Sequence, residues 1–189
     1  MATSAENLAS QARAASKKGP PPVHLWNPPF CGDLDMEIRR DGTWFYLGTP
    51  IGRPGLVKLF SSIIKKEGDD YFLVTPVEKV GIRVEDAPFV AVDFTAKGTG
   101  RDQALTFVTH VEDEVTASAE NPIRVARDPD TSEPSPYVLV RRNLEALIDR
   151  KSFYRLVELG CHESYEGSSW FGLWSSGTFF PVIPSDELP

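Results

Sequence analysis

Apolar and charged residues alternate strictly over residues 33–38. Every second position is apolar, from Leu34 to Ile38, and the positions between them are acidic, which is the pattern of a strand with one buried face. The following Asp41-Gly42 pair is typical of a two-residue hairpin turn, and residues 43–47 are again β-branched or bulky. We therefore predict a β-hairpin in which Ile38 lies opposite Phe45. This register places four side chains together on the outer face: Glu37, Arg39, Trp44 and Tyr46.

A strand face that is exposed to water does not usually carry two large aromatic rings beside charged side chains. We expect this face to meet a helix, another part of the protein or a ligand. The acids Asp33 and Asp35 share the face and are explained by alternation alone. A divalent-metal site built on these two acids remains an open alternative.

The rest of the pattern predicts an α+β protein with two helices. The first helix, residues 54–67, begins at a proline and ends before Gly68. The second helix covers residues 143–159, with a kink at Ser152, which could cap a second segment. Apolar stretches predict strands at residues 71–75, 79–85, 89–95, 103–111, 114–118, 123–126, 137–140, 170–174 and 178–182.

A repeat relates the two helical regions. Residues 47–60 and 144–157 align without gaps at an offset of 97, which matches Arg53 with Arg150, and each segment is followed by an aromatic strand. Chance similarity between amphipathic helices is the alternative. We predict a duplication with halves at residues 23–96 and 97–184, flanked by a tail of residues 1–22 that is flexible or separately helical and by a short tail of residues 185–189. The interface between such halves is a frequent place for a ligand cleft.

Composition narrows the range of partners. The chain has 189 residues, 41% of them hydrophobic, and a net charge of -7, which disfavours general binding to nucleic acids or to anionic membranes. No apolar run approaches the roughly 18 residues of a membrane span. The first 19 residues lack the apolar segment of a secretory signal, and the isolated thiols of Cys31 and Cys161 are typical of a reducing compartment. We therefore expect a cytoplasmic protein.

Three longer segments carry a family resemblance. They read FCGDLDMEIRRDGTWFYLGTPIGRPGLVKLF, YFLVTPVEKVGIRVEDAPFVAVDF and YVLVRRNLEALIDRKSFYRLVELG. Together they resemble an uncharacterised proteobacterial domain-of-unknown-function family, over nearly all of residues 23–183. The resemblance implies a duplicated α+β core whose C-terminal half is superficially similar to pleckstrin-homology folds. It also implies a cleft between the halves, for a nucleotide-like ligand, and a role in bacterial signalling, but no established activity.

Candidates for catalysis are weak. The adjacent residues Cys161 and His162 do not provide the spatial pairing that a nucleophile and its base require, and residues 97–102 lack the ending of a phosphate-binding loop. We assign no catalytic residue and no metal ligand, and the cofactor stays unknown. Enzymatic activity is left open, although the sequence favours a binding protein.

Arginines and aromatic rings form the strongest binding pattern. Besides the outer face of the hairpin, the pattern comprises Arg53, Arg150 and the pair Arg141-Arg142. This combination is typical of nucleotide binding, because aromatic rings stack on bases and guanidinium groups bind phosphate. We expect a non-catalytic module that binds a nucleotide-like anion between the halves, with a protein partner also conceivable. The alternatives are structural roles for these side chains, a metal-dependent hydrolase using the strand acids, and a protein-interaction adaptor without a small ligand.

Overall fold

The structure is a computed structural model that describes residues 3–189. Its internal contacts divide the chain into two compact units, Met1–Pro88 and Phe89–Pro189. The expected boundary between residues 96 and 97 therefore lies too late. Strand β7 (Phe89–Lys97) belongs entirely to the second unit, where it pairs along its length with β8.

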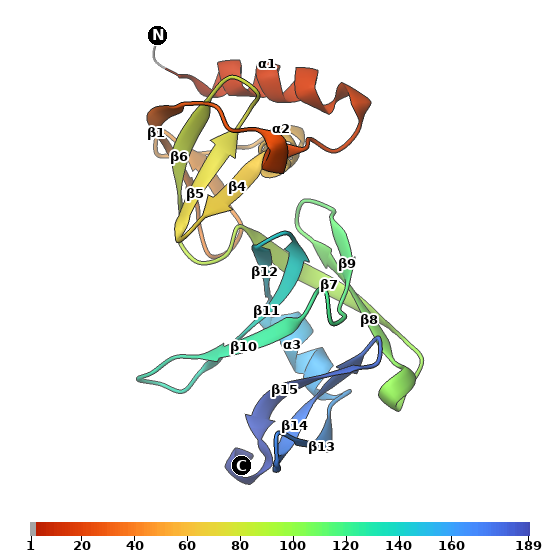
Figure 1. Cartoon of the computed structure of the whole chain (residues 1–189). Helices are drawn as coiled ribbons and strands as arrows, with labels where there is room; N and C mark the ends of the chain where they lie inside the picture. Colours follow the sequence, from red (N-terminus) through yellow and green to blue (C-terminus); the bar gives the residue numbers. More distant parts are fainter. Residues whose placement is uncertain (1–2) are drawn as a thin grey trace. The chain divides into compact units, whose positions relative to one another are not determined.

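The N-terminal unit contains one six-stranded sheet (Figure 1). Two antiparallel meanders, each of three strands, join through the parallel pair β1/β6, which gives the strand order β3-β2-β1-β6-β5-β4. The strands are β1 (Phe30–Ile38), β2 (Trp44–Tyr46), β3 (Thr49–Pro50), β4 (Ile64–Glu67), β5 (Asp70–Val74) and β6 (Lys79–Val84). Helix α2 (Pro54–Ser61) connects the meanders, and its residue Phe60 is fully buried.

A helix precedes this sheet, where we expected a tail that is flexible or separately helical. Helix α1 (Ala5–Ala15) starts at Ser4, whose hydroxyl accepts a hydrogen bond from the backbone N–H of Asn7 at 3.3 Å. Leu8 is completely buried, and Gln11 accepts a 2.6 Å hydrogen bond from the hydroxyl of Thr75. For residues 5–15 the flexible alternative is therefore wrong and the helical one is correct, except that the helix packs on the unit and is not separate. Residues 1 and 2 lie outside the described part. Two 3-10 turns, η1 (Ser16–Lys18) and η2 (Val23–Leu25), lead to β1.

The C-terminal unit contains a six-stranded and a three-stranded sheet (Figure 1). The first has the order β10-β11-β12-β7-β8-β9, with β12 parallel to β7. Its further strands are β8 (Ala104–Thr109), β9 (Glu114–Thr116), β10 (Ile123–Arg127), β11 (Pro134–Arg141) and β12 (Leu144–Ile148), with the turn η3 (Gly100–Asp102) before β8. Helix α3 (Arg150–Val157) leads to the second sheet, β13 (Cys161–Tyr165), β14 (Ser168–Ser175) and β15 (Thr178–Pro184), and to the turn η4 (Ser185–Glu187).

Both predicted helices are shorter than expected, because part of each segment pairs as a strand. Residues 64–67 form β4, in which Ile64 lies opposite Leu73 of β5. Residues 144–148 form β12, in which every second residue is buried. Helix α3 is then capped by Asp149, whose carboxylate accepts a 2.8 Å hydrogen bond from the backbone N–H of Ser152, so Ser152 is not the cap. In both places strand pairing overrides a helical sequence pattern.

The α+β class and the duplicated architecture are confirmed. In each unit a three-stranded meander, an eight-residue helix and a second three-stranded meander follow one another, as β1-β2-β3-α2-β4-β5-β6 and as β10-β11-β12-α3-β13-β14-β15. The meander β7-β8-β9 is additional in the second unit. The likeness of this unit to pleckstrin-homology folds stays a prediction. No helix among the described residues is both long and apolar enough to span a membrane.

Candidate functional site

The hairpin β1/β2 has a different register from the predicted one. Ile38 lies opposite Trp44, and Glu37 lies opposite Phe45. The turn contains an extra residue, because the backbone N–H of Arg39 donates to the carbonyl of Thr43 at 3.0 Å and Gly42 adopts a φ of 88°, as in a three-residue loop that ends in a left-handed residue. A shift by one residue moves every side chain of β2 to the opposite face. The predicted outer face is therefore wrong for Trp44 and for Tyr46, which lies opposite Met36 and not opposite Glu37.

Trp44 belongs to the core of the N-terminal unit. Its side chain is 1% exposed, and its ring stacks on Phe60 with centroids 6.2 Å apart. Its place on the outer face is taken by Phe45, whose ring centroid lies 3.8 Å from the guanidinium carbon of Arg39. Arg39 therefore has an aromatic partner, as predicted, but a different one.

The acids of β1 are balanced by a neighbouring strand. Arg83 of β6 forms a 2.7 Å ion pair with Asp35, and its guanidinium lies 3.9 Å from Glu37. The hydrogen bond with Asp35 raises the pKa of Arg83 above its ordinary value. In the described part of the chain, no three Asp, Glu, His or Cys side chains gather in a way that could hold a metal ion.

The predicted arginines of the C-terminal unit do not form one cluster. Arg141, at the end of β11, pairs with Asp113 at 2.7 Å and lies 4.8 Å from the ring centroid of Phe89. Arg150 pairs with Glu133, which precedes β11. At about 3.3 Å per strand residue, the two ends of β11 lie roughly 25 Å apart.

Arg142 occupies the tight turn between β11 and β12, with a φ of 51°. Desolvation, and to a smaller degree the charge of Arg141, lowers the pKa of its guanidinium below the ordinary value. The cleft expected between the halves stays a prediction. The pockets described next each lie within one unit.

The N-terminal unit has a pocket of about 450 Å³ beside α1 and the start of α2. Two of the predicted site residues, Tyr46 and Arg53, line it, together with Arg13 of α1. Glu6 is the third charged residue of the lining, whereas Phe60, which also lines the pocket, is fully buried. We name this hollow the α1–α2 pocket. It depends on the packing of α1, which buries Leu8 and leaves Arg13 exposed.

Arg13 and Arg53 differ from the other arginines. Within residues 3–189, neither side chain has an ion pair, a hydrogen bond or an aromatic contact. The guanidinium of Arg39 lies on the ring of Phe45, and Arg142 also has an interaction partner within the chain. Ion pairs engage the remaining arginines: Arg40, Arg83, Arg101, Arg124, Arg127, Arg141, Arg150 and Arg155. Sequence reasoning missed Arg13, although the spacing of Ala5, Leu8, Ala9 and Ala12 already marks the buried side of a helix.

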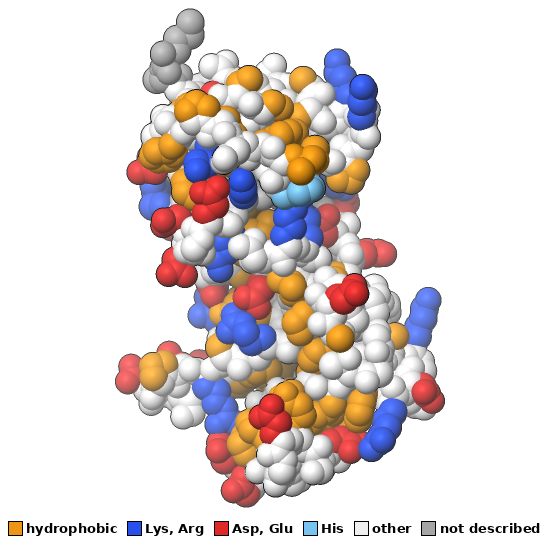
Figure 2. All heavy atoms as spheres, viewed as in Figure 1, with side chains coloured by type: hydrophobic (Ala, Val, Ile, Leu, Met, Phe, Trp, Pro, Cys, Tyr) orange, Lys and Arg blue, Asp and Glu red, His pale blue; other side chains and the backbone are white. Residues whose placement is uncertain are grey.

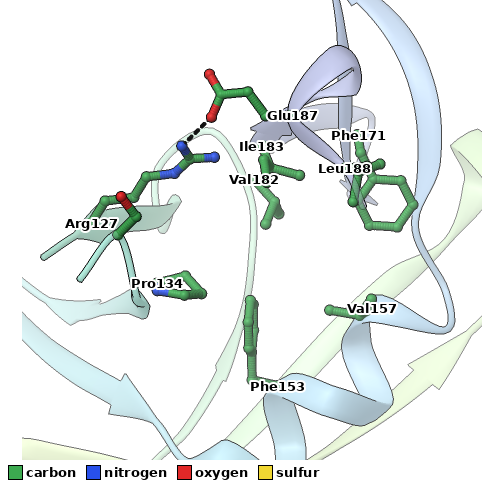
Figure 3. A pocket seen from close by; sticks show the side chains of 10 residues that line it. Arg127, Pro134, Phe153, Val157, Phe171, Val182, Ile183, Glu187 and Leu188 are labelled. Atoms are coloured by element: carbon green, nitrogen blue, oxygen red, sulfur yellow. Dashed lines mark hydrogen bonds and ion pairs between the residues drawn. The ribbon is translucent and has the colours of Figure 1, made fainter.

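The C-terminal unit has a more apolar pocket of about 380 Å³ (Figure 3). Phe153 and Val157 of α3 face the same space as Val182 and Ile183 of β15 (Figure 3). The only charged residues that line it are Arg127 and Glu187, which form an ion pair with each other. We name this hollow the α3 pocket. A wider hollow of about 740 Å³ along β10 and β15 shares both of these charged residues.

The segment after β15 is held by polar contacts. The hydroxyl of Ser185 lies 2.8 Å from Nδ1 of His162 and 2.8 Å from the hydroxyl of Ser169. Burial raises the pKa of the thiol of the neighbouring Cys161. A raised pKa leaves less of the nucleophilic thiolate at neutral pH.

Comparison with known proteins follows the same division. The model of the DUF1285 N-terminal domain, described as a domain of unknown function, matches residues 21–87. The C-terminal domain of the DUF1285 protein of unknown function matches residues 88–182. A search of curated proteins gave no match.

Two crystal structures are similar to this chain. A DUF1285 family protein from Silicibacter pomeroyi DSS-3 is 66% identical, over 95% of this chain and 96% of that chain, with a TM-score of 0.86. A DUF1285 family protein from Shewanella baltica OS155 is 32% identical, over 66% of this chain and 91% of that chain, with a TM-score of 0.53. With both domain models matched in order along its length, the chain belongs to the DUF1285 family.

Proposed function

We propose that the protein is a non-catalytic binding module whose N-terminal unit takes a small anionic ligand in the α1–α2 pocket. The observation that carries this proposal is the pair Arg13 and Arg53. Both line the same pocket, and neither side chain has a partner within residues 3–189. Guanidinium groups bind carboxylate and phosphate through paired hydrogen bonds.

The charge distribution makes this pair unusual for the chain. The net charge is -7, and on the face visible in Figure 2 basic and acidic side chains are interspersed. A ligand with phosphate or carboxylate groups would therefore be attracted to few places. Two unpartnered arginines beside one pocket provide such a place.

The pocket also fits the size and the aromatic part of the expected ligand. About 450 Å³ lies in the range of small-molecule sites. Tyr46, which is half-buried, lines the pocket and offers a ring for stacking. These features support a nucleotide-like ligand, and a role in bacterial signalling is the part of the proposal that comes from the family resemblance.

The test is a calorimetric titration of the full chain with adenosine diphosphate, adenosine and inorganic phosphate. We expect adenosine diphosphate to bind, and Arg13→Ala and Arg53→Ala each to weaken binding by about tenfold or more, since one hydrogen bond to a charged group contributes roughly 1.5–3 kcal/mol. The matched control is Lys17→Ala, which removes one positive charge just after α1 without touching the pocket. Equal affinity in the parent and in both arginine variants would contradict the proposal.

The metal-dependent hydrolase is less well supported. It would require both strand acids to be available to the ion, whereas Asp35 is held by Arg83 at 2.7 Å. A protein-interaction adaptor without a small ligand would give a negative titration with all three probes.

A further inference from the structure

We propose a second binding site, independent of the one above, in the α3 pocket of the C-terminal unit. Its ligand is a small amphipathic carboxylate, with an apolar body in the pocket and its carboxylate on Arg127. The ligand competes for this arginine with Glu187, the residue that pairs with it in the structure.

The apolar body has a suitable environment. Apart from Arg127 and Glu187, the side chains that face the hollow are almost all apolar (Figure 3). They come from separate parts of the chain: Pro134, Phe153, Val157, Phe171, Val182, Ile183 and Leu188. A hollow of about 380 Å³ lies near the lower end of the range for small-molecule sites. Filling it with a hydrocarbon chain would remove the exposed parts of these side chains from water.

The charged rim indicates the head group. Arg127 is the only cation that lines the pocket, and its side chain is 33% exposed. A carboxylate already lies on its guanidinium, that of Glu187 (Figure 3). The next residue, Leu188, lines the pocket. Glu187 and Leu188 therefore present the same chemistry as the proposed ligand, an acid beside an apolar group.

The carboxylate of Glu187 can move away from Arg127 without disrupting β15, the strand that precedes it. Its side chain is 51% exposed, so its carboxylate would be hydrated after leaving. The chain just before it is anchored separately, through the hydroxyl of Ser185 to His162 and Ser169 at 2.8 Å each. Displacement therefore needs only residues 186–189 to move, beyond the end of β15 at Pro184.

The geometry predicts opposite effects for the two members of the ion pair. Arg127→Ala removes the partner of the ligand carboxylate and should weaken binding about tenfold, as the loss of one charge-assisted hydrogen bond does. Glu187→Gln removes the competitor and should strengthen binding by up to about fivefold, which corresponds to the upper value for an exposed ion pair. If the ion pair had only a structural role, the two substitutions would not change octanoate affinity in opposite directions.

The experiment is a calorimetric titration of the full chain with octanoate, below the concentration at which octanoate forms micelles. Octylamine, with the same tail and the opposite head charge, is the ligand control. Lys97→Ala is the protein control, because it removes an exposed positive charge of the same unit that does not line the pocket and should leave octanoate binding unchanged. Val157→Trp, which fills the hollow from an exposed position, should abolish binding while the circular dichroism spectrum of the parent is retained.

The proposal fails if octanoate does not bind, if octylamine binds as tightly as octanoate, or if Glu187→Gln weakens octanoate binding as Arg127→Ala does. Failure here would leave the proposed function untouched, since that function is measured with adenosine diphosphate and with variants of the N-terminal unit.

Discussion

Replacing Trp44 tests whether its role is structural, as the register of β1/β2 requires. The side chain is 1% exposed and stacks on Phe60, so Trp44→Ala removes a large buried ring and should cost about 3–5 kcal/mol of unfolding free energy. Trp44→Phe keeps a ring in place. It also removes the indole N–H, which is buried and has no acceptor among the described residues, and burying such a donor costs about 1–3 kcal/mol. We therefore expect Trp44→Phe to cost less than half as much as Trp44→Ala.

The measurement is urea unfolding, combined with amide hydrogen exchange read separately for each unit. Exchange should accelerate in β1 and α2 of the Trp44→Ala variant, while strands β13–β15 serve as an internal control. The register predicted from the sequence would place Trp44 on the outer face, where truncation usually changes stability by no more than about 0.5 kcal/mol. A Trp44→Ala variant as stable as the parent would refute the core assignment.

Two further predictions concern stability. Leu8→Ala in α1 should cost about 2–5 kcal/mol of unfolding free energy, because Leu8 is completely buried. Leu25→Ala, at a position 72% exposed, should be nearly neutral. Equal urea midpoints for the two variants would show that α1 does not pack as described. Lys79 and Lys65 lower the pKa of Glu67 below 4.5 through ion pairs at 3.0 and 3.4 Å. The parent should therefore be more stable than Glu67→Gln at neutral pH and lose this advantage as the pH falls below 4.5, and an advantage that persists in strong acid would contradict the assigned pairing.

The hairpin shows how far local sequence determines structure. Alternation placed β1 and its buried face correctly, because Leu34, Met36 and Ile38 are all buried. The dipeptide Asp41-Gly42 fits both a two-residue turn and a three-residue loop with Gly42 in the left-handed region. The choice between them depends on which face of β2 fills the core. The stacking of Trp44 on Phe60 is a contact with a helix that the hairpin sequence alone does not reveal.

The candidate site was predicted only in part. Tyr46 and Arg53 line the α1–α2 pocket, although the reasoning had placed them at a cleft between halves. Arg13 was missed because the buried side of α1 consists mostly of alanine, which gives a weak hydrophobic signal. The strongest apolar residue on that side is Leu8, and the helix is held by its contacts with the rest of the unit rather than by its own pattern.

The repeat relates α2 to α3, but the corresponding strands around the two helices are arranged into sheets differently. The offset of 97 matches α2 with α3 and continues through the strands that follow, so that β4, β5 and β6 correspond to β13, β14 and β15. In the first unit the two meanders join through β1 and β6. In the second, the corresponding strands β10 and β15 belong to different sheets, and Arg127 at the end of β10 meets Glu187 just beyond β15. Where a continuous sheet would close this region, the second unit instead has the wider hollow along β10 and β15, with the α3 pocket beside that ion pair. The same sequence of elements thus leaves a hollow in the second unit at the point where the first unit forms a hydrogen-bonded strand pair.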